Sequence, residues 1–357
     1  MPRARWLTNA VLAVGSLLVS LFAAEVVLRG FVQLPMRRVL PEVRYAPHPV
    51  RRFTLVPNQQ AFTYGAPVRI DARGFRANGD TRPPADARSE VLALGDSFTF
   101  GLGVRDHETW PAQLEQALVK TLGRPAEVVN AGTISYGVFQ ELDLLRTAGL
   151  ATRPRIVIHA LYWNDFMSAS PPAPGAPAVV DANGYLTWDA LDPPGTLRHV
   201  AALATTSSAL VFSVRQAAST YGRSDKGGQG YAAEYRRFLE TGLTAQDWEP
   251  IDRFYQDFKR IGAEHDFTPF VVIMPMSELT GGDMFMHAFP AAAREMLGRL
   301  GIPFLDAFGL WSGRRHGEYF LSQGADAHLN PEGYRFVAEA TARALLGNPI
   351  LRARLQQ

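Results

Sequence analysis

The sequence contains no cysteine among its 357 residues. Disulfide bonds, thiolate nucleophiles, zinc sites with cysteine ligands and lipid-modified cysteines are therefore all excluded. An excess of one charge is also lacking, because 36 Lys and Arg face 34 Asp and Glu for a net charge of +2. Without a basic excess, or a basic run interleaved with aromatic residues, we expect no nucleic-acid partner.

Motifs for common cofactors are missing as well. The segment Gly101-Leu102-Gly103 lacks the third glycine of a dinucleotide loop, and the chain has no Walker loop and no GxSxG elbow. Its 8 histidines show no metal-ligand spacing. We therefore expect no cofactor and no metal. Hydrophobic residues make up 47% and charged residues 20%, which indicates an ordinary globular chain of roughly two domains.

The N-terminal segment is the longest uncharged stretch. Residues 6–24 read WLTNAVLAVGSLLVSLFAA, and these 19 residues approach the ~20 that a helix needs to cross a bilayer. Arg3 and Arg5 precede the stretch, as at a cytoplasmic end, and Glu25 and Arg29 follow it four residues apart. Phe22 fits poorly at the −3 position of a cleavage site. We predict an uncleaved transmembrane signal-anchor over residues 1–31; a cleaved signal peptide and a buried helix are the alternatives.

The remainder divides into two parts by composition. Residues 32–88 are rich in Arg and Pro and hold short β-type pieces such as 52–55 and 67–70, which predicts a small β-rich neck. From residue 89, apolar runs alternate with helical segments. The predicted strands are 91–94, 127–130, 155–161, 269–274 and 303–306, and the predicted helices are 108–121, 139–149, 246–264 and 331–346. This alternation indicates a parallel sheet covered by helices, with ligands at the carboxyl ends of its strands.

One long segment interrupts the alternation. About a hundred residues separate the third and fourth strands, with many prolines over 168–195, a helical piece near 200–218 and a glycine-rich stretch at 226–230. We treat about 166–245 as an insertion, either a cap on the substrate side or a surface excursion.

Candidate chemistry concentrates where the first strand ends. Leu94 is followed at once by Gly95-Asp96-Ser97, so Ser97 would be exposed at the top of the sheet, next to the start of a helix. Glycines on either side permit a tight turn and close approach of a substrate. Ser97 is therefore the candidate nucleophile.

Four separated blocks resemble the SGNH, or GDSL-type, hydrolase family. They are the serine block at Ser97, Val129-Asn130-Ala131-Gly132, Tyr162-Trp163-Asn164-Asp165 and Asp326-Ala327-His328-Leu329-Asn330-Pro331. Each follows a predicted strand or precedes the last helix. The resemblance implies an α/β fold with three α/β/α layers around a flavodoxin-like parallel sheet of five strands, over residues 89–350. The stretch from Gly101 to Trp110 and the neck are also similar to membrane-anchored bacterial members.

The resemblance also implies the roles of single residues. Ser97 would be the nucleophile and His328 the general base. The oxyanion hole would be formed by the N–H groups of Ser97 and Gly132 and by the side chain of Asn164. Tyr162 stands where the family has a glycine before Asn164.

The acid of the triad departs from the common pattern. Most members place it three residues before the histidine, where this chain has Ala325. Asp326, two residues before, matches a subgroup that resembles exopolysaccharide acetylation proteins, and it could share a face with His328. The alternative is a Ser–His dyad with a backbone carbonyl holding the imidazole.

Neighbouring residues receive plainer interpretations. We expect Asp96 and Asp165 to brace loops and His159 to pack in the core. Trp163, beside Asn164, is the candidate substrate-binding residue.

The function implied is a serine esterase that forms an acyl-enzyme on short acyl or O-acetyl esters of lipids or glycans. It would be a single-pass protein of the bacterial inner membrane with its catalytic part facing the periplasm. An O-acyltransferase acting on an extracytoplasmic polysaccharide and a non-catalytic binding protein are the alternatives. The sequence does not indicate the oligomeric state.

Overall fold

The computed structural model describes residues 2–32, 39–79, 89–168, 180–186, 196–221, 237–238, 240–276, 287–311, 318–321 and 328–357. The body is an α/β fold around a parallel sheet of 5 strands in the order β6-β5-β7-β8-β9. The strands are β5 (Val91–Leu94), β6 (Val128–Asn130), β7 (Ile156–Leu161), β8 (Thr268–Ile273) and β9 (Phe304–Asp306). All five predicted strands are confirmed, with bounds shifted by one residue at most.

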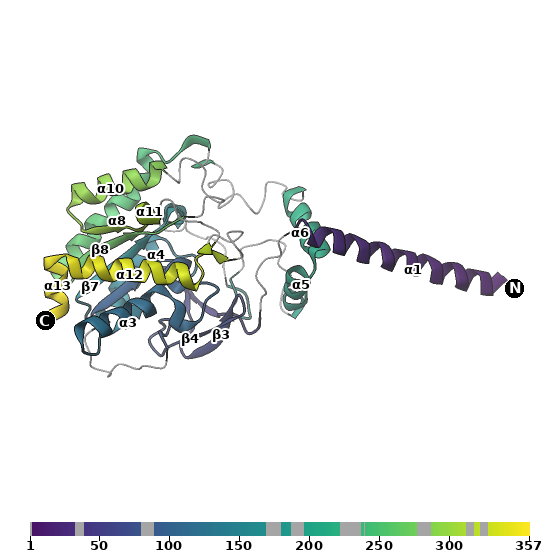
Figure 1. Ribbon diagram of the computed structural model, residues 1–357, viewed down its shortest axis with the longest axis horizontal. Helices are drawn as coiled ribbons and strands as arrows, with labels where there is room; N and C mark the ends of the chain where they lie inside the picture. The colour runs from purple at the N-terminus through teal and green to yellow at the C-terminus, as the bar shows by residue number, and fades with distance from the viewer. Residues whose placement is uncertain are drawn as a thin grey trace.

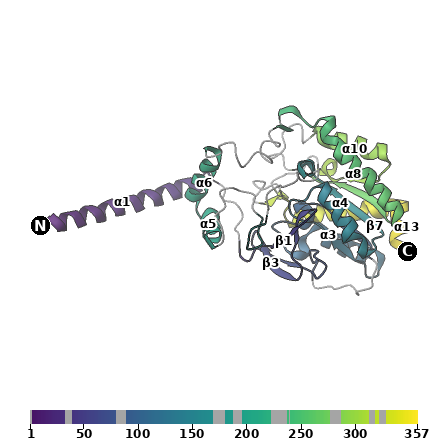
Figure 2. The same ribbon diagram turned by 180° about the vertical axis from the view of Figure 1, so that it is seen from behind.

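Helices cover both faces of this sheet, which is why its strands are apolar runs without alternation. Figure 1 shows α3 (Trp110–Leu122) and α12 (Pro331–Gly347) on the near face, and Figure 2 shows α4 (Val138–Thr147), α8 (Ala245–Glu264) and α10 (Phe289–Leu300) on the opposite face. The shorter helices of the body are α2 (Ser97–Phe100), α11 (Ala307–Trp311) and α13 (Pro349–Gln356), with 3-10 turns at Asp106–Glu108, Gly149–Thr152 and Trp163–Ser168. The three-layer prediction is confirmed.

The ends of the helices follow their capping residues. Asn330 caps α12 by accepting a hydrogen bond from Gly333 N at 3.0 Å, and Pro331 occupies the first turn, where its missing N–H costs nothing. The helical piece expected near 200–218 is two helices, α5 (Thr196–Ser207) and α6 (Ala209–Tyr221), separated at Ser208.

The predicted β-rich neck consists of two antiparallel hairpins. One pairs β1 (Tyr45–His48) with β2 (Arg52–Leu55), and the other pairs β3 (Gln59–Thr63) with β4 (Ala66–Ile70). Beyond β4, Arg76 N donates to Asn130 O at 3.1 Å. The neck therefore joins the body at the carboxyl end of β6.

The N-terminal helix α1 (Pro2–Arg29) projects from the rest of the molecule, with α5 and α6 at its inner end (Figures 1 and 2). Its segment Thr8–Arg29, 22 residues long, is apolar enough to cross a membrane, and its most apolar stretch is 0% buried. The division of the chain at residues 31 and 88 stays a prediction.

Candidate active site

The turn after β5 presents Ser97. Gly95 adopts φ +152°, and a Cβ there would collide with the side chain of Thr99, so only glycine fits this position. Asp96 then caps α2, accepting a hydrogen bond from Phe98 N at 2.8 Å on Oδ1. Ser97 opens the helix with 7% of its surface exposed. The turn thus brings one hydroxyl to the carboxyl edge of an otherwise apolar sheet.

His328 meets this hydroxyl from the other end of the chain. Its Nε2 lies 2.7 Å from Ser97 Oγ, although 231 residues separate the two in sequence. The imidazole stacks on Phe98, with ring centroids 4.7 Å apart and planes at 27°. Its backbone carbonyl accepts a hydrogen bond from Leu321 N at 2.8 Å. The pair of side chains that the sequence predicts is therefore brought together, and Phe98 orients the imidazole.

Asn164 reaches the same turn from the end of β7. Its Nδ2 donates to Asp96 Oδ2 at 2.7 Å, and Ser97 Oγ lies 3.5 Å from that oxygen. Burial raises the pKa of Asp96, and the hydrogen bonds from Asn164 and Phe98 N oppose the rise. The sequence predicts that Asp96 braces its own turn, but it gives no signal for the bond to Asn164.

Gly132, the other predicted oxyanion donor, packs directly on α2. A Cβ at this position would overlap the backbone of Thr99 and Phe100. Its N–H donates to Asn130 Oδ1 at 3.0 Å, and Thr133 N donates to Gly95 O at 3.0 Å. Gly132 is thus held beside the Ser97 helix, with its N–H bonded inside its own loop.

Two further predicted residues are Trp163 and Asp326. Trp163 is only 6% exposed and packs beside Tyr162, with ring centroids 5.9 Å apart. It therefore offers little surface to a substrate. Asp326 lies outside the residues that the structure describes.

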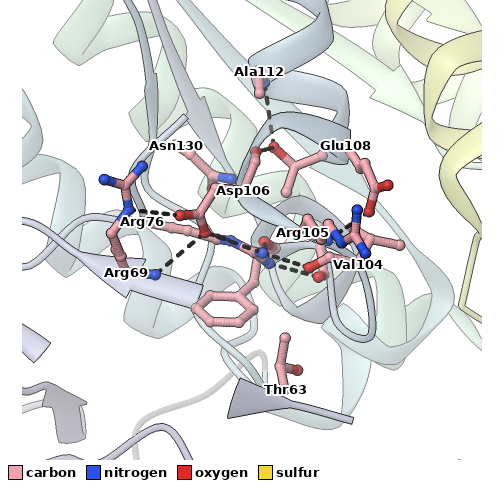
Figure 3. A network of polar contacts seen from close by, with 12 residues as sticks. Thr63, Arg69, Arg76, Val104, Arg105, Asp106, Glu108, Ala112 and Asn130 are labelled. Carbon is pink, nitrogen blue, oxygen red and sulfur yellow. Dashed lines mark hydrogen bonds and ion pairs between the residues drawn. The ribbon is translucent and has the colours of Figure 1, made fainter. Parts of the chain in front are cut away.

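Arg76, which follows the hairpins of the neck, binds the backbone at the end of the Ser97 helix. Arg76 is buried, and its Nη1 donates to Phe100 O at 2.5 Å and to Gly101 O at 2.6 Å. Figure 3 shows Arg69 and Arg76 converging on Asp106, whose carboxylate lies 3.4 Å from Arg76 Nε. Burial lowers the pKa of Arg76 to about 10, and the charge of Asp106 counteracts this effect. Arg76 was not predicted from the sequence, because its only local signal is the abundance of Arg in the neck.

The sequence of this chain is similar to those of a known enzyme family. The sequence profile of the GDSL-like lipase/acylhydrolase family matches residues 93–336. The chain belongs to this family. It is a GDSL-type hydrolase that acts on ester bonds. No curated protein matches its sequence.

Several solved structures are similar to this GDSL-type hydrolase. A lipolytic protein of the G-D-S-L family from Desulfitobacterium hafniense is 16% identical, over 71% of this chain and 98% of the other, with a TM-score of 0.40. A variant of an acetyl-xylooligosaccharide esterase from Geobacillus is 12% identical, over 72% and 93%, with a TM-score of 0.43. An α/β hydrolase from the metagenome of Lake Arreo is 14% identical, over 72% and 95%, with a TM-score of 0.43.

A second polar cluster lies inside this hydrolase, beneath the Ser97 turn. His159 is wholly buried in β7, with Nε2 2.7 Å from Glu141 Oε2 and Nδ1 2.7 Å from the Tyr255 hydroxyl. Asp165, also buried, accepts a hydrogen bond from Tyr162 N at 2.8 Å. His159 packs in the core as expected, but its two polar partners, Glu141 of α4 and Tyr255 of α8, were not anticipated.

Burial sets the protonation of this cluster. It raises the pKa of Glu141 and of Asp165 well above the usual range, and it lowers the pKa of His159. Ligand atoms of these three residues lie within 4.8 Å of one another, a spacing that could hold a metal ion. Both ring nitrogens of His159 already have hydrogen-bond partners, however. A cluster neutralised by protons on its carboxyls accounts for the same contacts.

Proposed function

We propose that this hydrolase is a serine esterase in which Ser97 attacks the ester and His328 is the general base. The observation that carries the proposal is the 2.7 Å distance between Ser97 Oγ and His328 Nε2 at the carboxyl edge of the sheet. A serine hydroxyl is a weak nucleophile until a neighbouring base takes its proton, and this contact is a direct route for that proton.

The reaction has two steps, acylation of Ser97 and hydrolysis of the acyl-enzyme. Ser97 Oγ bonds to the ester carbonyl carbon while its proton passes to His328 Nε2. The tetrahedral intermediate then collapses, the bond to the alcohol oxygen breaks, and His328 returns the proton to that oxygen. Water repeats the sequence on the acyl-enzyme, releasing the acid and restoring both side chains.

The negative oxygen of the intermediate needs fixed donors. Asn164 Nδ2 carries two hydrogens, and the bond to Asp96 occupies one of them, leaving the other for the substrate oxygen. Asp96 thus orients the amide in advance, which favours catalysis because little reorganisation remains. The N–H groups of Ser97 and Gly132 complete the proposed oxyanion hole, once Gly132 N–H turns from Asn130 to the substrate.

Asp326 is the proposed third member of the triad on its position two residues before His328. It would accept a hydrogen bond from the imidazole and stabilise its charged form. A dyad using a backbone carbonyl instead is the alternative. Trp163 remains the proposed substrate-binding residue, through the small part of its surface that is exposed.

The substrate class follows from the family and from α1. We assign the enzyme to short acyl or O-acetyl esters of lipids or glycans, in the membrane-anchored subgroup that resembles exopolysaccharide acetylation proteins. It would be a single-pass bacterial inner-membrane protein with its body in the periplasm. An O-acyltransferase would use the same pair but deliver the acyl group to a sugar hydroxyl. Diversion of labelled acetyl from free acid to an added polysaccharide would identify the transferase.

A fluorophosphonate probe tests the central pair, because it bonds only to an activated serine. The detergent-solubilised full chain should be labelled, and Ser97→Ala should abolish the labelling. Ser89→Ala is the matched control, since Ser89 is a buried serine bonded to Thr152 and should leave labelling intact. Labelling that persists in Ser97→Ala would refute the assignment.

A further inference from the structure

The helices α5 and α6 meet the inner end of α1 at a specific joint. Glu25 accepts hydrogen bonds from Ser208 Oγ at 2.8 Å, Ala209 N at 3.0 Å and Leu210 N at 2.9 Å. Arg29 Nη2 donates to Ser207 O at 2.6 Å and pairs with Glu25. The ion pair between Glu25 and Arg29 therefore lies where two distant segments of the chain are joined.

This joint uses backbone groups at two helix ends, which distinguishes it from a chance contact between surface side chains. Glu25 satisfies N–H groups in the first turn of α6, which have no partner within the helix, and its negative charge lies at the positive end of the α6 dipole. Arg29 matches it by binding a carbonyl at the end of α5. The end of α1 is thus bonded to both helices of the insertion, as expected of a helix that remains in the mature protein.

The pair α5–α6 exposes apolar side chains at helical spacing. Leu197, Val200 and Leu203 follow one another at intervals of three on α5, and Val211 and Val214 do so on α6. Val200 is 62% exposed and Val214 is 61% exposed. Side chains three residues apart share a helix face, so each helix presents an apolar stripe outward.

Charge along the same segment has one sign. Residues 196–221 contain Arg198 and Arg215 but no Asp or Glu. A basic segment with an apolar face is the composition of helices that lie on anionic membranes.

The position of Glu25 and Arg29 along α1 sets the depth at which helices α5 and α6 lie relative to the bilayer. At 1.5 Å per residue, the 22 residues Thr8–Arg29 span about 33 Å, close to the ~30 Å hydrocarbon core. Glu25 and Arg29 therefore mark the level at which α1 leaves the hydrocarbon. Figures 1 and 2 show α5 and α6 lying crosswise at this end of α1, as helices in the interface would.

We infer that α5 and α6 form an interfacial helix pair, which lies on the membrane surface. Their apolar face inserts into the bilayer leaflet that is nearer to the body of the enzyme. The occupant of this face is lipid. α12 begins after the two residues that follow His328, and its N-terminal end points to the side of α5 and α6 in both views. The catalytic edge thus faces the membrane, so the substrate is an ester presented at the bilayer surface. This inference rests on the proposed membrane anchor.

The absence of cysteine makes the test direct, because a single introduced cysteine can carry the only label. The full chain is reconstituted in vesicles of phosphatidylcholine and phosphatidylglycerol, with a nitroxide near the top of the acyl chains. An environment-sensitive fluorophore is placed at Val200→Cys or Val214→Cys. Leu12→Cys in α1 is the positive control, and Lys120→Cys on the exposed side of α3 is the negative control.

We expect the labels at 200 and 214 to lose roughly half or more of their emission to the nitroxide lipid, as shallowly inserted side chains do, while Lys120→Cys keeps its emission. Loss of emission at 12 alone would overturn the interfacial helix pair but keep the anchor. Blue-shifted emission at 200 and 214 without quenching would mean that protein, such as a second copy of the chain, covers the face. No quenching at 12 would instead refute the anchor in the proposed function.

A second variant tests the joint itself. Glu25→Ala removes the acceptor for α6, so the label at 214 should lose most of its quenching while the label at 12 keeps its own. Glu25→Gln, which retains one acceptor oxygen, should give an intermediate value. Unchanged quenching at 214 in Glu25→Ala would show that the joint does not hold α6 at the interface.

Discussion

Two histidines of this hydrolase make equally short contacts in opposite surroundings. His328 Nε2 lies 2.7 Å from Ser97 Oγ at the carboxyl edge of the sheet, and the imidazole is partly exposed. His159 Nε2 lies 2.7 Å from Glu141 Oε2 inside the sheet, with no exposed surface. The distance is the same, so it cannot distinguish a reacting pair from a structural one. The two imidazoles differ in burial, since His328 has exposed surface and His159 has none.

The two sites are nonetheless adjacent. Asp96 lies between them, and a charge on either imidazole would lower its pKa. The charge of Asp96 in turn raises the pKa of Glu141. A buried cluster that stays neutral therefore adds no competing charge beneath the Ser97 turn. The comparison predicts that changes at His328 affect rate, whereas changes at His159 affect stability.

The largest expected effect is on the rate. His328→Gln should lower kcat/KM for a chromogenic acetyl ester by on the order of 10⁴-fold, because Asp96 Oδ2, at 3.5 Å, is a more distant acceptor for the proton of Ser97. The free energy of unfolding should change by less than about 1 kcal/mol, since the imidazole is partly exposed. Initial rates and urea unfolding in detergent measure the two quantities. Wild-type turnover in this variant would remove His328 from the role of base.

The next effect is on stability. His159→Leu leaves the Glu141 carboxyl and the Tyr255 hydroxyl without partners, at about 1–3 kcal/mol each, so the free energy of unfolding should fall by about 2–6 kcal/mol. The folded fraction should still react with the fluorophosphonate probe. His265→Leu, at an exposed site after α8, is the control and should change stability by less than about 0.5 kcal/mol.

Loss of probe reactivity in folded His159→Leu would contradict the division of roles. It would mean that the buried cluster controls the reacting groups through Asp96. Unchanged stability would show instead that Glu141 and Tyr255 find other partners in the core.

The parts of this fold that could be predicted are those whose cause is local. Strands β5 and β7 are unbroken apolar runs, α12 begins with Asn330 and Pro331, and the Ser97 turn needs glycine at position 95. Each of these signals lies within a few residues of the structure that it produces. The pairing of Ser97 with His328 was accessible only through the resemblance of four separated blocks.

The missed features depend on contacts between distant segments. Glu25 bonds to α6 across 185 residues, and His159 bonds to Tyr255 across 96 residues. Arg76 supports the Ser97 turn from a neck with many other arginines. Neither spacing nor composition separates these residues from ordinary surface charges or core aromatics, because tertiary packing alone gives them partners.

The smallest effect concerns the pH dependence of stability, which distinguishes the buried His159 cluster from the Ser97–His328 pair. The unfolded chain releases the Glu141 proton above its ordinary pKa of 4.5, while burial keeps the folded pKa well above this value. The unfolded state then binds fewer protons, so the free energy of unfolding falls as pH rises, by up to about 1.4 kcal/mol per pH unit for this group. His159 acts in the opposite direction below its ordinary pKa of 6.5, because its folded pKa is lowered. The opposing contributions leave a clear fall only above about pH 6.5.

Glu141→Gln removes the titratable proton of the Glu141 carboxyl, while the amide that replaces it can still donate a hydrogen bond to His159. Relative to wild type, the variant should therefore gain stability as pH rises from roughly 6.5 to 8.5, by up to about 1.4 kcal/mol per unit, in urea titrations followed by tryptophan fluorescence. Glu249→Gln, at an exposed position of α8, is the matched control. Its curve of stability against pH should run parallel to that of the wild type. A parallel curve for Glu141→Gln as well would mean that the buried carboxyl is ionised in the folded protein. His159 would then have to carry the compensating charge, and the contrast with His328 would lose its physical basis.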